Sequence, residues 1–172
     1  MRTYLIGAAA AVALTAGVAA GIATPAGAAA PVPACKGNLI AFSHNRPQGA
    51  AGHGNVILRF RNVSQGTCSL RGYPGVDALG RHGGVLAHAT RTLHGFTGGT
   101  SAVRTIVLHS WQRASADLEW ANFGANGRSC RFSKSLAVTP PNTTRTFHSS
   151  LSVSVCSLQI HPVVKGTSGD AP

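Results

Sequence analysis

The sequence contains few acidic residues. It has four Asp and Glu residues against 15 Lys and Arg, which gives a formal net charge of +11. A Ser–His–Asp hydrolase needs an acid to orient its histidine, and the G-x-S-x-G turn that exposes many such nucleophiles is absent. The histidines, among them His82, His88 and His94, form no H-x-H, H-x-x-x-H or H-E-x-x-H motif that would indicate zinc. We therefore expect no enzyme activity, no catalytic residue, no metal site and no cofactor.

The four cysteines also lack a C-x-x-C pair, which excludes the usual signature of a redox site or a zinc knuckle. An even number of cysteines in an exported chain indicates disulfide bonds. Four cysteines allow three connectivities, and the residues alone leave all three open. Pairing neighbours along the chain would close two loops of roughly 30 residues, each stabilising the fold by about 3–4 kcal/mol in the chain-entropy model. The residues concerned are Cys35, Cys68, Cys130 and Cys156.

Only one stretch of the chain is apolar over a long run, and it lies at the start. Met1-Arg2 is followed by the apolar segment 5–23 and by the small-residue pattern Ala26-Gly27-Ala28. This order is typical of a secretory signal peptide, here residues 1–28, with cleavage after Ala28 or Ala29. A membrane anchor is the alternative, but Gly17, Gly21 and Pro25 interrupt the run.

The expected product is a secreted chain with no transmembrane segment after cleavage. A second alternative is a lipid anchor on Cys35, since Val32-Pro33-Ala34-Cys35 faintly resembles a lipobox. We expect an Ala/Pro arm over 29–34, a single domain over 35–165 and a disordered tail over 166–172.

No window carries a helical apolar period over three turns, and short runs rich in Val, Ile, Thr and Leu are separated by Gly, Pro, Asn and Ser. This pattern predicts about seven to nine short strands and an all-β, two-sheet sandwich. The expected strands are 38–44, 55–63, 67–70, 76–79, 85–89, 104–109, 113–121, 135–139 and 152–164, the last bent near Cys156. Pro74-Gly75 predicts a type II turn with a positive φ at the glycine, and the Gly/Thr-rich segment 91–101 is expected to be a mobile loop.

Two strands alternate most clearly between apolar and polar residues. The alternation predicts that one face of each strand is buried and the other lies in water. The residues expected to be buried are Val56, Leu58, Phe60, Leu118 and Trp120, and those expected in water are Arg59, Arg61, Asp117 and Glu119. Asp117 and Glu119 are the only close carboxylate pair, and their predicted exposure argues against a catalytic role.

Two blocks indicate a family. They are Gly54–Ser64, with an L-x-F-x-N-x-S pattern, and Cys68-Ser69-Leu70-Arg71-Gly72-Tyr73-Pro74-Gly75-Val76. With the leading Cys35, the later Ala114–Trp120 and the last two cysteines, they resemble the secreted domain-of-unknown-function 4232 family of high-GC Gram-positive bacteria. The resemblance spans about residues 35–164 and implies an immunoglobulin-like sandwich with Cys35–Cys68 and Cys130–Cys156 bridges. It implies no enzyme activity. The family's usual Pro-Gly-Gly is replaced by Trp111-Gln112-Arg113, so we expect that turn to differ.

The excess of arginine indicates an anionic partner. Signal cleavage would leave 14 basic residues against the four acids, and such a surface attracts polyanions. The speculative binding residues are Arg59 and Arg61 on one strand face, and Arg128, Arg131 and Lys134 around Cys130. A generic basic surface with no local site is the alternative.

We therefore expect a non-enzymatic binding or envelope-associated module. Its expected partners are anionic cell-wall polymers or another extracellular protein. No specific nucleic-acid partner is expected, because an aromatic platform for bases is missing. The alternatives are a secreted hydrolase and a secreted inhibitor or protein-interaction domain.

Overall fold

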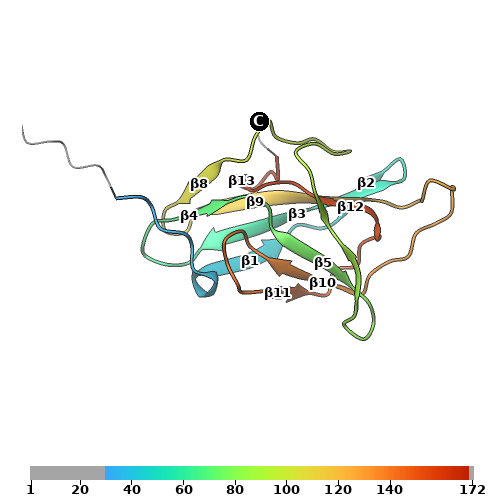
Figure 1. The fold of residues 1–172 in the computed structure, drawn as a ribbon, viewed down its shortest axis with the longest axis horizontal. Coiled ribbons are helices and arrows are strands. Elements are labelled where there is room, and N and C mark those ends of the chain that lie inside the picture. Colours follow the sequence, from blue (N-terminus) through green and yellow to red (C-terminus); the bar gives the residue numbers. More distant parts are fainter. Residues whose placement is uncertain (1–29, 171–172) are drawn as a thin grey trace, which may run out of the picture. The chain divides into compact units, whose positions relative to one another are not determined.

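The computed structural model describes residues 30–170, and these form an all-β domain with two packed sheets (Figure 1). The predictions for the signal peptide and for residues 171–172 lie outside the described residues. Among the described residues the single helical element is the 3-10 turn η1 (Gly37–Leu39), so no helix there could cross a bilayer. The predicted immunoglobulin-like two-sheet sandwich is confirmed.

The first sheet carries the two strongly alternating strands side by side. Its order is β1 (Ile40–His44), β3 (His53–Asn62), β9 (Arg113–Ala121), β12 (Cys156–Ile160) and β7 (Thr90–Arg91). The short strands β2 (Gln48–Ala50) and β13 (Val164–Lys165) pair with β3 and β9. β3 and β9 are antiparallel over their full length, from His53 opposite Ala121 to Arg61 opposite Arg113.

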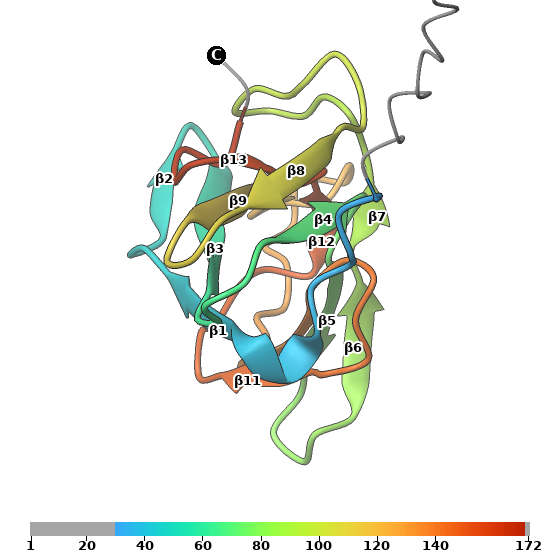
Figure 2. The ribbon, with the colours of Figure 1, turned by 90° about the vertical axis from the view of Figure 1, so that its left-hand side faces the viewer.

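The second sheet has the order β11 (Phe147–Ser149), β10 (Ser135–Thr139), β5 (Gly75–Leu79) and β6 (Val85–His88). A separate pair, β4 (Cys68–Arg71) and β8 (Thr105–Leu108), lies at one end of the domain (Figure 2). Every predicted strand is present, β9 and β10 with the predicted bounds and the others with shifted bounds, and three short strands, β2, β7 and β11, were not predicted. The run 152–164 is divided into β12 and β13, and its pairing with β9 shifts register after Cys156, where a bend was expected.

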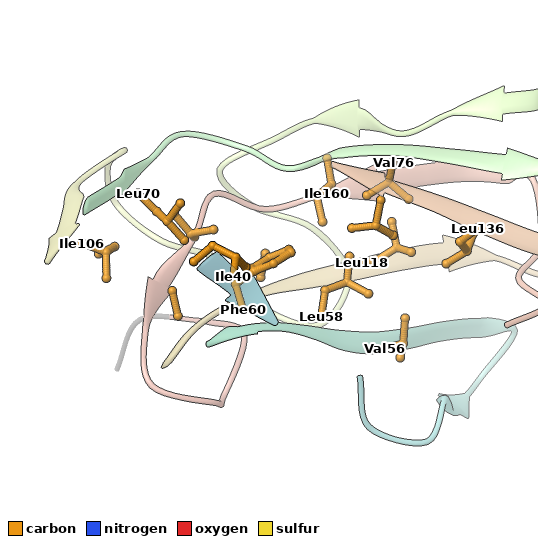
Figure 3. Close-up of a cluster of buried hydrophobic side chains, with 14 of the residues drawn as sticks. Ile40, Val56, Leu58, Phe60, Leu70, Val76, Ile106, Leu118, Leu136 and Ile160 are labelled. Atoms are coloured by element: carbon orange, nitrogen blue, oxygen red, sulfur yellow. The ribbon is translucent and has the colours of Figure 1, made fainter. Parts of the chain in front are cut away.

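The core lies between the sheets. Figure 3 shows Val56, Leu58 and Phe60 of β3 on the side that faces Val76 and Leu136 of the second sheet. These five side chains are at most 3% exposed. Leu118 and Trp120 of β9 are also buried, so the predicted core face is confirmed.

Two disulfides tie the strands together, Cys35 to Cys68 and Cys130 to Cys156, and no cysteine is free. This is the predicted pairing. The Cys35 sulfur is bonded to Cys68, so it is not available for the lipid anchor considered as an alternative.

Two sequence-based predictions are wrong, the exposure of Asp117 and Glu119 and the position of the positive φ near Pro74. Asp117 and Glu119 are 1% and 0% exposed, because two distant segments cover their side of the sheet. One is the Gly/Thr-rich segment 91–101, and the other is 166–170. The positive φ near Pro74 belongs to Gly72, at 106°, because Gly75 already pairs with Thr139 in the sheet.

Candidate functional site

The candidate site lies on the outer face of the first sheet, which is the face turned away from the core. Residues at alternate positions of β3 and β9 point to this face, since cross-strand partners share a side. The segment between β7 and β8 and the chain after β13 lie together above β9 (Figures 1 and 2). They cover the centre of the face and leave its two ends open.

Arginines gather at the end of the face where β9 begins. Arg61 lies directly opposite Arg113, and Arg59 opposite Ser115 one step along the same side. Beside them Trp111 is 54% exposed, and the guanidinium carbon of Arg61 lies 5.2 Å from the centre of its ring. We call Arg59, Arg61, Arg113 and Trp111 the arginine face.

The backbone holds Trp111 in place. Its φ of 66° is left-handed, and its N–H donates to the Asn62 carbonyl oxygen at 2.8 Å. A non-glycine residue in this conformation costs free energy, so the surrounding contacts must maintain it. This is the turn in which the sequence departs from the Pro-Gly-Gly of the family that it resembles. The departure places an indole against an arginine at the surface.

The predicted basic residues form two groups. Arg59 and Arg61 lie together, whereas Arg128, Arg131 and Lys134 follow the other end of β9, in the loop seen at the far right of Figure 1. Nine strand residues separate these ends, a distance of roughly 25–30 Å at about 3.3 Å per residue. Arg113, which sequence reasoning did not single out, completes the first group.

No arginine or lysine among the described residues forms an ion pair with a carboxylate; the ion pairs there all involve histidine. The one acid on the open surface, Asp77, accepts a hydrogen bond from His88 at 2.6 Å. The charge of the arginine face is therefore available to a ligand.

The other three acids meet at the covered centre of the outer face. The Thr97 hydroxyl lies 2.7 Å from Asp117 Oδ2 and 2.9 Å from Glu119 Oε2, and the Thr97 N–H donates to the same Glu119 oxygen at 2.9 Å. His161 is fully buried and lies between Glu119 and Asp170. Its Nε2 is 3.3 Å from Glu119 Oε1, and its Nδ1 is 2.9 Å from Asp170 Oδ1. We call Asp117, Glu119 and Asp170, together with Thr97 and His161, the carboxylate clamp.

Burial raises the pKa of Asp117 above its usual range, and the nearby charge of Asp170 acts in the same direction. Hydrogen bonds from Thr97 and Asn55, and the proximity of His161, partly offset this rise in pKa. The Asn55 amide donates to both oxygens of Asp117, at 3.2 and 3.1 Å. Each carboxylate oxygen of Asp117 thus has a donor, as buried charge requires.

The clamp holds the fold together and shows no opening for a substrate. None of the main clefts of the described domain is lined by Asp117, Glu119 or Asp170. Within residues 30–170 no group of three or more His, Cys, Asp or Glu side chains is placed to hold a metal ion. The clamp instead fixes Thr97 and Asp170, and with them the two covering segments.

Sequence reasoning missed the clamp because its partners are far apart in the chain. A usable signal was the scarcity of acids: two of only four lie two residues apart on one strand. In a chain with so few acids, such a pair indicates either a functional site or a buried hydrogen-bond network.

These features define a disulfide-bonded β-sandwich with arginines at one end of its outer face and a buried carboxylate network at the centre. The family model described as "Domain of unknown function (DUF4232)" matches residues 35–169, and the chain belongs to this family. No curated protein and no solved structure matches the chain.

Proposed function

We propose that this protein is a secreted, non-enzymatic module that binds anionic polymers of the cell surface through its arginine face. The observation that carries the proposal is the meeting of Arg59, Arg61 and Arg113 on one face of two paired strands, with no carboxylate partner. The two disulfides support an extracellular location, since such bonds persist in oxidising compartments.

The chemistry of the arginine face suits phosphate or carboxylate groups along a polymer. A guanidinium group presents paired N–H donors that match these anions bidentately. Trp111 adds an exposed ring against which the apolar part of a repeating unit can pack. The closed carboxylate clamp supports a binding role over the hydrolase alternative.

The test is a titration of the chain lacking residues 1–28 with a teichoic-type poly(glycerol phosphate) at several salt concentrations. The double variant Arg59→Gln/Arg61→Gln removes two charges from the arginine face. The matched control is Arg128→Gln/Arg131→Gln, which removes the same charge at the other end of β9.

We expect the Arg59/Arg61 variant to bind about tenfold more weakly, as for two exposed contacts of roughly 0.5–1 kcal/mol each. The slope of log affinity against log salt should become shallower by up to about 2, one for each phosphate that is no longer neutralised. The control should keep most of the affinity. Equal weakening in both variants would leave only a generic basic surface, and salt-independent binding would contradict the proposal.

A further inference from the structure

A cleft lies on the outer face of the first sheet, at the end opposite the arginine face. It is a cleft of about 420 Å³ between the β2–β3 hairpin and the segment after β7. We call it the hairpin cleft. Its lining residues are Gln48, Gly49, Ala50, Ala51, His53, Gly54, Asn55, Phe96 and Thr97.

We propose that the hairpin cleft binds a neutral sugar ring. This site is separate from the arginine face and does not depend on the function proposed for it. Three features of the cleft lead to this ligand class: an exposed aromatic ring, a set of neutral polar groups with fixed orientations, and the absence of charged side chains in its lining.

The aromatic ring is that of Phe96. It is 48% exposed, although it is packed on the imidazole of His53 with ring centres 4.0 Å apart. The two rings are tilted by 32°, and part of the phenyl ring remains exposed. A pyranose ring has an apolar C–H face that can lie on such a surface, and burial of that face would be favourable.

The polar groups are positioned by neighbours outside the cleft. Because the Asn55 amide nitrogen donates to Asp117, its carbonyl oxygen is left as an acceptor with no partner among the described residues. The Thr97 hydroxyl lies between two carboxylates and is held there. His53 Nδ1 is buried and has no hydrogen-bond partner in the described part of the chain. A buried polar atom of this kind is a candidate for a bond to a ligand hydroxyl.

The carboxylates behind the cleft, and the lack of a basic side chain in its lining, exclude an anionic ligand. No Lys or Arg lines it, and Asn55 and Thr97 both bond to the buried carboxylates behind them. A phosphate or carboxylate would therefore meet a negative field with no counter-charge. Hydroxyl groups, which donate as well as accept, suit the unpaired Asn55 oxygen.

The experiment follows backbone amide shifts by NMR while the chain lacking residues 1–28 is titrated with methyl glycosides of glucose, galactose, mannose and N-acetylglucosamine. The concentration is raised to about 50 mM, above the millimolar Kd expected of a single ring. A neutral glucose tetramer is the second arm, which distinguishes a free monosaccharide from a unit of a polymer. Phe96→Ala is the test variant, and Phe132→Ala is the control, because Phe132 is equally exposed, at 49%, and lies outside the cleft.

We expect shifts confined to residues 48–55 and 96–97 with at least one glycoside. Phe96→Ala should weaken binding by about fivefold, as for removal of an aromatic surface from beneath the sugar, and Phe132→Ala should not. Absence of shifts with every glycoside and with the tetramer would overturn the proposal, and so would equal binding by Phe96→Ala. The Arg59→Gln/Arg61→Gln variant should bind the sugar normally, so failure of either proposal is distinguishable from failure of the other.

Discussion

A direct test of the packing concerns Gly54 on β3 and Trp120 on β9, which lie opposite each other in the sheet. A Cβ atom added at Gly54 would lie 2.5–2.6 Å from three atoms of the Trp120 indole, and these are its three nearest neighbours. Such contacts are far inside van der Waals distance. The indole is 4% exposed and its Nε1 donates to Asn122 at 3.1 Å, so it cannot simply swing aside.

The structure gives a magnitude for each change. Gly54→Ala overpacks the site and should destabilise the fold by about 1–3 kcal/mol. Trp120→Ala removes a large buried side chain and should cost about 3–5 kcal/mol. In the double variant the methyl group introduced at position 54 enters the space that the indole has left. The second change should then cost nothing, or stabilise by up to about 1 kcal/mol through the loss of glycine's chain entropy.

The assay is urea unfolding followed by far-UV circular dichroism, because Trp120→Ala removes one of the two tryptophans. Gly84→Ala is the control, since a Cβ there meets nothing within 4 Å, and it should be close to neutral. A coupling energy of about 1–4 kcal/mol is expected from the double-mutant cycle. Additivity within about 0.5 kcal/mol would refute the reasoning, because it would mean that the two residues do not compete for the same space.

Three further predictions concern the disulfide, the carboxylate clamp and the C-terminal segment. Replacing the Cys130–Cys156 bridge by two alanines should lower the free energy of unfolding by about 3–4 kcal/mol, measured with urea against the oxidised parent. The pKa of Asp117 is raised above 3.8, so the folded state binds this proton more tightly than the unfolded state does. The stability that this group contributes is therefore fully present below about pH 3.8 and is lost as the pH rises through its folded pKa. Asp117→Asn should lessen that loss in unfolding titrations from pH 4 to 8, and an unchanged pH profile would contradict the prediction. Ending the chain after Lys165 removes the contacts of the 166–170 segment with the sheet and should cost about 1–3 kcal/mol. Ending it after residue 170 leaves those contacts in place, and equal stability of the two shortened chains would contradict this role.

The inner face of the first sheet could be predicted because its signal is local. Val56, Leu58 and Phe60 alternate with Ile57, Arg59 and Arg61, and a period of two places the first three on one side of a strand whatever lies elsewhere. The disulfide pairing came from resemblance to a family, since the cysteines alone allowed three connectivities.

The outer face could not be predicted in the same way, because its burial is non-local. Asp117 is covered by Thr97, 20 residues earlier, and Glu119 is bonded by His161, 42 residues later. The alternation shows only which side of the strand carries polar residues. Such a side is expected to be exposed unless a segment distant in the sequence covers it. The arginine face was only partly predictable for the same reason: Arg59 and Arg61 share a strand, but the position of Arg113 depends on the register between β3 and β9.

Thr97 connects the carboxylate clamp to the hairpin cleft. Its hydroxyl and N–H bond to the carboxylate clamp, and the same residue lines the hairpin cleft beside Phe96. Any ligand in the cleft that holds Thr97 must therefore also stabilise the clamp, because whatever binds the folded state alone raises its stability. The clamp in turn keeps Asp117 and Glu119 buried and Asp170 partly buried, and in the described domain Asp77 is the one acid outside the clamp. The hydrogen bonds from Thr97 to these buried acids thus order the segment that carries Phe96.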